Sequence, residues 1–149
     1  MKSKFCILAL ILVLFLPNTG RAQSTTPDLM GTWISVTGEV AHWSGTLKHF
    51  GEQVGILKVE EQLGGVFRGH MVYQNEKSGP KFEGSDGIDH TLSEPVLGVI
   101  DWDGKSVVWV DKDDETVHRA RLVNSRTMEV IAYEPGEHAV VNRMIMIRK

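Results

Sequence analysis

Histidine, aspartate and glutamate are the residues of this sequence that could hold a metal ion or transfer protons. The 6 histidines occur singly, without a His-x-His or His-x-x-x-His pair, at His42, His49, His70, His90, His118 and His138. A zinc site needs three or four ligands that converge at ~2.0 to 2.3 Å, and isolated histidines do not predict such a set. We therefore expect no metal and no cofactor.

The densest group of carboxylates, from Asp111 to Glu115, has some features of a calcium loop. It lacks the glycine at the sixth position and the glutamate at the twelfth that an EF-hand requires, so we interpret it as a solvated hairpin tip. Hydrolytic chemistry has no better support, because the sequence contains no Gly-x-Ser-x-Gly. Neighbouring Glu60 and Glu61 would point to opposite faces of a strand. We predict no catalytic residue.

The aromatic side chains favour ligand binding instead. Pockets in small barrels are lined by large rings, together with a few polar groups that orient the ligand. The alternative is that the rings simply fill the core. The candidates for pocket lining are four rings and four polar residues that would contribute if they face inward: Arg68, His70, Tyr73, Trp102, Trp109, Arg119, Arg121 and Tyr133.

Short strands must position these side chains, because no window of the sequence shows helical periodicity. Turn signals such as Asp103-Gly104 and Pro135-Gly136 divide the second half of the chain. Connections this short join antiparallel neighbours, which predicts a meander of hairpins. Its strands are expected at Val96–Ile100, Val107–Val110, Val117–Val123, Met128–Tyr133 and Ala139–Ile147.

The first half adds three strands, at Leu29–Val40, Val54–Glu61 and Val66–Gln74. Gly69 predicts a sharp curve in the third of these, as barrel closure requires. About eight strands in an open sheet would leave two exposed edges, and closure removes them. We therefore predict an all-β fold, a single up-and-down antiparallel β-barrel. Its interior could be filled by side chains or hold one small ligand.

Two segments fall outside the predicted strands. Residues 1–22 have the features of a secretory signal peptide: Lys2 and Lys4, an apolar run from Phe5 to Leu16, and small residues before a cleavage site at Ala22. Residues 23–28 form a flexible leader to a barrel domain at 29–149. The breaker-rich stretch Asn75–Glu94 predicts a long loop with one short strand near residues 81–83.

Composition limits the environment and the partners. The only cysteine, Cys6, lies in the signal peptide, so the exported chain has no disulfide. Removal of Lys2, Lys4 and Arg21 leaves 13 basic against 19 acidic residues, a net charge of −6. This balance argues against nucleic acid or an anionic membrane as a partner. We expect a secreted or periplasmic protein with no membrane association after cleavage.

Short motifs resemble those of the calycin group, the avidin-like and lipocalin-like barrels. Gly31-Thr32-Trp33 looks like the Gly-x-Trp that opens these barrels, and Gly65-x-Phe67-x-Gly69 is similar to an early avidin strand. The runs Leu97–Trp102 and Ser106–Trp109 resemble two consecutive tryptophan-bearing strands of avidins. The resemblance implies the barrel architecture. It does not imply biotin binding, because Ser35, Glu39, Met71, Tyr73 and Arg143 keep little of the avidin hydrogen-bonding pattern.

The resemblance also implies structural roles for Gly31, Trp33 and one arginine. In these families an arginine or lysine near the last strand packs across the opening tryptophan. Arg143 is the first candidate and Arg148 the second. Alternation places Arg143 on the side of the last strand that holds Val141, Ile145 and Ile147, which is the side that we expect to face inward.

Three functions remain open. The leading hypothesis is an exported, non-catalytic barrel that binds a small apolar or amphipathic molecule in its interior. The second is a structural or homo-oligomerising module with a packed interior and an outer apolar face at Val140, Met144 and Met146. The third is a barrel enzyme of the isomerase or hydrolase kind, which would need a buried carboxylate or histidine inside the barrel.

Overall fold

A computed structural model describes residues 26–52, 54–73, 92–112, 115–137 and 139–149. The predicted signal peptide, residues 23–25 of the leader, His90, His138 and the short strand expected near residues 81–83 lie outside the described residues. The part of the chain that the structure describes contains no helix with the length and hydrophobicity needed to cross a membrane.

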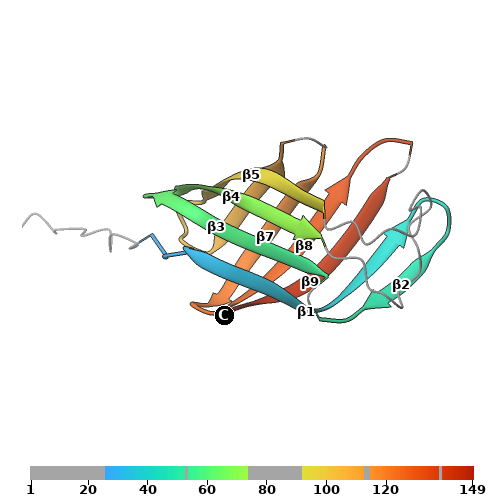
Figure 1. The fold of residues 1–149 in the computed structure, drawn as a ribbon, viewed down its shortest axis with the longest axis horizontal. Helices are drawn as coiled ribbons and strands as arrows, with labels where there is room; N and C mark the ends of the chain where they lie inside the picture. Colours follow the sequence, from blue (N-terminus) through green and yellow to red (C-terminus); the bar gives the residue numbers. More distant parts are fainter. Residues whose placement is uncertain (1–25, 53, 74–91, 113–114, 138) are drawn as a thin grey trace, which may run out of the picture.

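The described residues form nine β-strands in one sheet (Figure 1). Every pair of neighbouring strands is antiparallel. In chain order the strands are β1 (Gly31–His42), β2 (Leu47–Phe50), β3 (Gly55–Leu63), β4 (Val66–Tyr73), β5 (Leu92–Ile100), β6 (Ser106–Asp111), β7 (Val117–Asn124), β8 (Thr127–Glu134) and β9 (Val140–Arg148).

Eight of these strands close into a barrel, which confirms the predicted fold class. Strands β3 to β9 follow one another as a meander, and β1 joins β3 to β9. The pairing of β1 with β9 runs from Trp33 opposite Arg148 to His42 opposite Val140, with a register shift between Ser35 and Thr37. The first and last strands therefore close the sheet along nearly their whole length.

The ninth strand, β2, was not predicted. The first half of β1 pairs with β3 and the second half with β2, so β1 leaves β3 at about its midpoint. Figure 1 shows β2 beside this outlying half of β1. Strand β5 also begins earlier than expected, because residues 92–95 pair with the end of β4. This shortens the predicted loop before β5 at its C-terminal side.

Gly69 is required by the curvature of β4. A Cβ at this position would overlap the backbone carbonyl of Lys58 on the paired strand β3. The β3–β4 register shifts between Val59 and Glu61, opposite Gly69 and Arg68. A bulge of this kind bends the strand and increases its twist, as predicted from the glycine.

The barrel interior is one cluster of apolar side chains from all eight barrel strands. In β9 the buried residues are Met144 and Met146, while Val141, Ile145 and Ile147 are exposed. The prediction that Met144 and Met146 form an outer face is therefore wrong. Alternation divided β9 into the correct two faces, but both faces are apolar, so hydrophobicity did not indicate which one lies inside.

One end of the barrel is closed by Trp33 and Leu29, both fully buried. The Trp33 indole Nε1 donates a hydrogen bond to the Leu29 carbonyl at 2.9 Å. The Arg148 guanidinium lies 5.9 Å from the Trp33 ring centroid. It also donates to the carbonyls of Asp28 and Met30 and to the Asp28 carboxylate. These bonds fasten the chain ahead of β1 to the end of β9.

Arg148, and not Arg143, is thus the arginine that packs across Trp33. Arg143 lies on the outer face, where its Nε and Nη2 are each 2.6 Å from Glu39 Oε2. Its parity in β9 is that of exposed Ile145 and Ile147, which excludes it from the interior. Gly31 begins β1 with φ of 108°, a conformation that favours glycine.

Candidate ligand-binding site

The opposite half of the interior contains a buried polar cluster of Tyr73, Asp111 and His118. The Tyr73 hydroxyl lies 2.9 Å from Asp111 Oδ2 and 3.2 Å from His118 Nε2. His118 Nε2 lies 3.1 Å from the same Asp111 oxygen. The side chains of Asp111 and His118 are both 0% exposed. A carboxylate, an imidazole and a phenol therefore share one hydrogen-bonded site inside the barrel.

Strand alternation and register bring these groups together. Asp111 ends β6 and shares its inward face with Trp109, two residues earlier. Trp109 is opposite His118 in the β6–β7 register. Their rings stack with centroids 4.8 Å apart and planes 6° from parallel. The stacking ties the polar cluster to the apolar core, since Trp109 also belongs to that core.

The hydrogen bonds assign the proton on His118. An ionised carboxylate only accepts hydrogen bonds, so the Tyr73 hydroxyl and His118 Nε2–H both donate to Asp111 Oδ2. A neutral His118 then has a bare lone pair on Nδ1. Within the described part of the chain, three buried atoms of this cluster have no hydrogen-bond partner: Asp111 Oδ1, His118 Nδ1 and Trp109 Nε1.

Further polar residues are buried toward the same end of the barrel. Glu94 on β5 is 6% exposed and Thr116, just before β7, is 8% exposed. Asn142 on β9 carries a buried side-chain oxygen and has the inward parity of Met144. The interior thus changes from apolar, near Trp33, to polar and acidic near Asp111. Such an interior suits a molecule with one apolar and one polar part.

Two of the predicted pocket residues, Tyr73 and Trp109, belong to this cluster. Trp102 does not, because it is 98% exposed in the β5–β6 turn. Arg68 and Arg121 were candidates only if they faced inward, and they do not meet this condition. Arg68 pairs with Glu61 at 2.5 Å and Arg121 with Glu129 at 3.1 Å on the outer surface.

The remaining candidates also lie on the outer face. The Arg119 guanidinium is 5.9 Å from the centroid of the Tyr133 ring, and both residues have outward parity. His70 is half-buried beside Glu60, with its Nδ1 3.2 Å from the carboxylate. The physical reason is the same for each: the alternate positions, such as Ala120 and Leu122 in β7, fill the interior.

Asp111, His118 and Glu94 were not predicted as site residues. Asp111 was assigned to a solvated hairpin tip because acidic residues follow it, yet it is the last residue of β6 and faces inward. His118 shares its face with Ala120 and Leu122, and this pattern could have revealed an inward histidine. The spacing of the histidines alone could not reveal this site, because the partners of His118 come from other strands.

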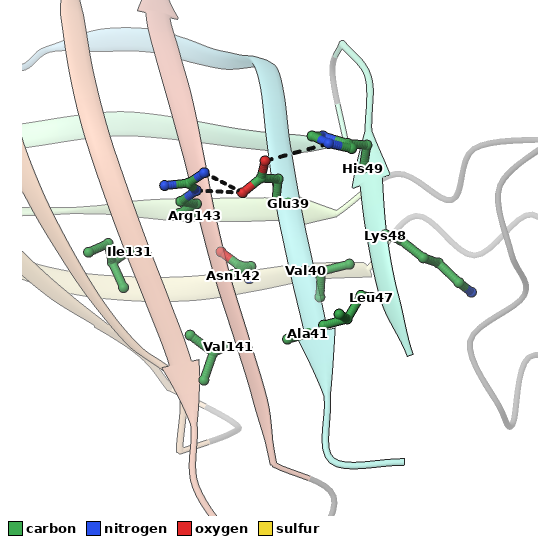
Figure 2. Close-up of a pocket in the computed structure, with 10 residues that line it drawn as sticks. All are labelled: Glu39, Val40, Ala41, Leu47, Lys48, His49, Ile131, Val141, Asn142 and Arg143. Carbon is green, nitrogen blue, oxygen red and sulfur yellow. Dashed lines mark hydrogen bonds and ion pairs between the residues drawn. The ribbon is translucent and has the colours of Figure 1, made fainter. Parts of the chain in front are cut away.

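The outer surface carries shallow depressions as well. One lies among β1, β2, β8 and β9 and is shown in Figure 2. Its Glu39 carboxylate binds Arg143 and lies 3.5 Å from His49. The hydrogen bond from Arg143 lowers the pKa of Glu39 below its ordinary value, and that bond raises the pKa of Arg143. A second depression, on β3 to β6, is lined in part by Arg68, His70 and Leu97.

Metal binding has no support in the described residues. No group of three or more histidine, cysteine, aspartate or glutamate side chains within them could hold an ion. Asp111 and His118 supply only two such side chains at one point, fewer than a structural or catalytic zinc site uses.

The chain shares its fold with a phycobiliprotein lyase. The S-type phycobiliprotein lyase CPES from Guillardia theta superimposes with a TM-score of 0.54 and 9% sequence identity, over 89% of this chain and 98% of that chain. No protein-family model and no curated protein matches the sequence.

At this identity the likeness concerns the fold alone. It agrees with the lipocalin-like barrel that the Gly31-Thr32-Trp33 motif implied, and with the closed eight-stranded sheet. Membership of the avidin-like or lipocalin-like families is a separate matter, which similarity of fold does not decide.

Proposed function

We propose that this chain is an exported, non-catalytic barrel that binds a small amphipathic molecule in its interior. The polar end of the molecule would lie against Asp111, His118 and Tyr73. The observation that carries this proposal is the set of buried polar atoms without partners on Asp111, His118 and Trp109.

The unpartnered atoms of this cluster do not stabilise the fold. A buried polar atom without a hydrogen bond costs roughly 1–3 kcal/mol, and buried ion pairs are often no more stable than apolar replacements. A bound molecule that supplies the missing hydrogen bonds would remove this cost. A barrel of eight strands is also of the size that holds one small ligand.

The structural neighbour supports the barrel architecture on which this proposal rests. Its name describes a lyase of phycobiliproteins, so a barrel of this shape occurs in a protein that acts on another molecule. Export is proposed from the signal-peptide pattern of residues 1–22. The acidic exported chain is proposed to have neither nucleic acid nor an anionic membrane as a partner.

The test is a titration in a variant that reports on the interior. Trp43 and Trp102 are 84% and 98% exposed, so a Trp43→Phe, Trp102→Phe variant keeps only the buried tryptophans Trp33 and Trp109. A panel of small aromatic alcohols, phenols and amines is added. Binding is expected to change the tryptophan emission and raise the melting temperature, and His118→Leu should weaken both effects. Absence of any response across the panel contradicts the proposal.

A second candidate function is self-association through the outer surface. Seven paired residues form an unbroken apolar row over β5, β6, β7, β8, β9, β1 and β2: Leu97, Val110, Val117, Tyr133, Val141, Ala41 and Leu47. Of these, Leu97, Val141 and Leu47 are 66%, 52% and 80% exposed. Contiguous exposed apolar surface is typical of interaction sites.

The occupant proposed for this row is a second copy of the chain. The neighbouring row contains Arg119, Ile131, Arg143 and Glu39, so it carries charges of both signs that a second copy could complement. Sedimentation of the wild type over a concentration series should then show a dimer, which Val141→Asp should dissociate. Thr37→Asp, an exposed change on β1 outside the row, is the control. A wild type that stays monomeric throughout contradicts this candidate.

A further inference from the structure

The atoms left without partners in the polar cluster are mostly acceptors, and this restricts the chemistry of the ligand. Resting on the function proposed above, we infer that the bound molecule donates hydrogen bonds from its buried end, through an O–H or N–H group. The atoms that would accept these hydrogen bonds are Asp111 Oδ1 and His118 Nδ1.

Asp111 provides the first acceptor. Its Oδ2 already accepts from the Tyr73 hydroxyl at 2.9 Å and from His118 Nε2 at 3.1 Å. Its Oδ1 is buried and accepts from no group within the described chain. In the described residues no lysine or arginine pairs with Asp111, whose polar neighbours are the Tyr73 hydroxyl and the neutral His118 ring. A buried carboxylate oxygen in this position requires a donor.

His118 provides the second acceptor. The bond from Nε2 to Asp111 directs the proton to that nitrogen, so Nδ1 of the neutral ring is an acceptor. The parallel stacking on Trp109 at 4.8 Å fixes the plane of the imidazole. Nδ1 is buried and also has no partner in the described part of the chain. Asp111 Oδ1 and His118 Nδ1 are therefore two acceptors that lack a donor within the described residues.

The third unpartnered group is the Nε1–H of Trp109, which can only donate. This group is buried and has no described acceptor. A hydroxyl or an amide both donates and accepts, so it can satisfy Trp109 as well as one of the two acceptors. An ether, an ester or a carboxylate offers acceptors alone and would place lone pairs against Asp111, which costs free energy of binding.

A matched pair of probes tests this inference. 2-Naphthol and 2-methoxynaphthalene have the same apolar body, but only the first has an O–H donor. Isothermal titration calorimetry on the wild-type exported chain should show 2-naphthol binding at least about tenfold more tightly, since a hydrogen bond to a charged group contributes ~1.5 kcal/mol or more, and 1.4 kcal/mol corresponds to a tenfold change.

Asp111→Asn should reverse the preference. Tyr73 and His118 hold the amide oxygen at the former Oδ2 position, which places the amide NH₂ where Oδ1 was, and that group donates. The variant is therefore expected to lose the preference for 2-naphthol, or to bind 2-methoxynaphthalene more tightly. Asp101→Asn makes the same chemical change at an exposed carboxylate after β5 and should keep the wild-type preference.

The outcomes separate the two proposals. Equal affinity of the wild type for both probes, or a preference that survives Asp111→Asn, overturns the inference about donors and leaves interior binding in place. Binding of neither probe overturns both. The comparison on the wild type requires no variant, so it decides the inference even where Asp111→Asn does not fold.

Discussion

The imidazole of His118 lies parallel to the indole of Trp109, with 4.8 Å between ring centroids and 6° between planes. Both residues are opposite one another on neighbouring strands and fully buried. This contact holds His118 Nε2 against Asp111 and joins the hydrogen-bonded cluster to the hydrophobic core. Structure and ligand chemistry at this end of the barrel therefore depend on the same pair of rings.

The Tyr73 hydroxyl should contribute measurably to stability. Tyr73→Phe removes the donor to Asp111 and leaves the ring, so the free energy of unfolding should fall by about 1–3 kcal/mol, as for other hydrogen bonds to charged groups. Urea denaturation measures the change. Tyr133→Phe, on the outer face, is the control and should alter stability by less than about 0.5 kcal/mol. Equal effects would contradict the buried hydrogen bond.

The two arginines of β9 should differ in their effect on stability. Arg148 covers Trp33 and donates to the backbone of Asp28 and Met30, so Arg148→Ala should cost about 1–3 kcal/mol. Arg143→Ala removes only an exposed ion pair with Glu39, so the free energy of unfolding should change much less than in Arg148→Ala. The stabilities of the two variants are compared by thermal and urea unfolding. A larger loss of unfolding free energy in Arg143→Ala than in Arg148→Ala would favour the prediction that Arg143 packs across Trp33.

The Asp28–Arg148 pair should make the free energy of unfolding depend on pH. The hydrogen bond from Arg148, and then the backbone N–H of Met30, lower the pKa of Asp28 below its ordinary value. A depressed folded-state pKa contributes stability above the pKa of the unfolded chain, and the contribution is lost as the pH falls through the folded value. The difference in unfolding free energy between the wild type and Asp28→Asn should therefore be present at neutral pH and vanish in acid. A constant difference across this range would contradict the ion pair.

A methyl group at Gly69 should disrupt the barrel. Gly69→Ala places a Cβ against the rigid backbone of Lys58, so the β3–β4 bulge must move, at a cost of about 2 kcal/mol or more. The control is Gly55→Ala, on the paired strand, where the new Cβ meets only the flexible ends of Met71 and Met144. Unfolding midpoints of the two variants are compared. Similar stability for both would show that the bulge can relax.

Export should remove residues 1–22. Expression of the full chain with its own leader, followed by mass spectrometry of the secreted or periplasmic fraction, is expected to give a protein that begins at Gln23. Ala22→Leu should block or shift the cleavage, because small residues are required before the cut. Ser24→Leu, beyond the site, is the control. An intact N-terminus in that fraction would contradict the predicted leader.

The fold could be predicted because strands and turns are local features of the sequence. The runs from Val107 to Tyr133 alternate with turn residues, and their predicted bounds agree with those of β6, β7 and β8 to within one residue at each end. The inward face of β9 could not be predicted, since Met144 and Ile145 are both apolar. Strand β2 was missed because Leu47–Phe50 is short and pairs only with the outlying half of β1.

The polar cluster was harder to predict because its members are far apart in the sequence. Tyr73 and Asp111 are 38 residues apart, and Tyr73 and His118 are 45 apart. Their meeting depends on the register of four neighbouring strands, and one slip would turn Asp111 outward. Tyr73 and Trp109 were chosen correctly as rings, but ring chemistry gave no reason to choose Asp111 beside them.

The seam between β1 and β9 has a consequence for biogenesis. The barrel cannot close before β9 has been synthesised, because β9 must pair with β1, and the hydrogen bond from Lys149 N–H to the Thr32 carbonyl belongs to the same late contact. Contacts of such long sequence separation form slowly. Until β9 has been synthesised, the sheet therefore remains open along the outlying half of β1.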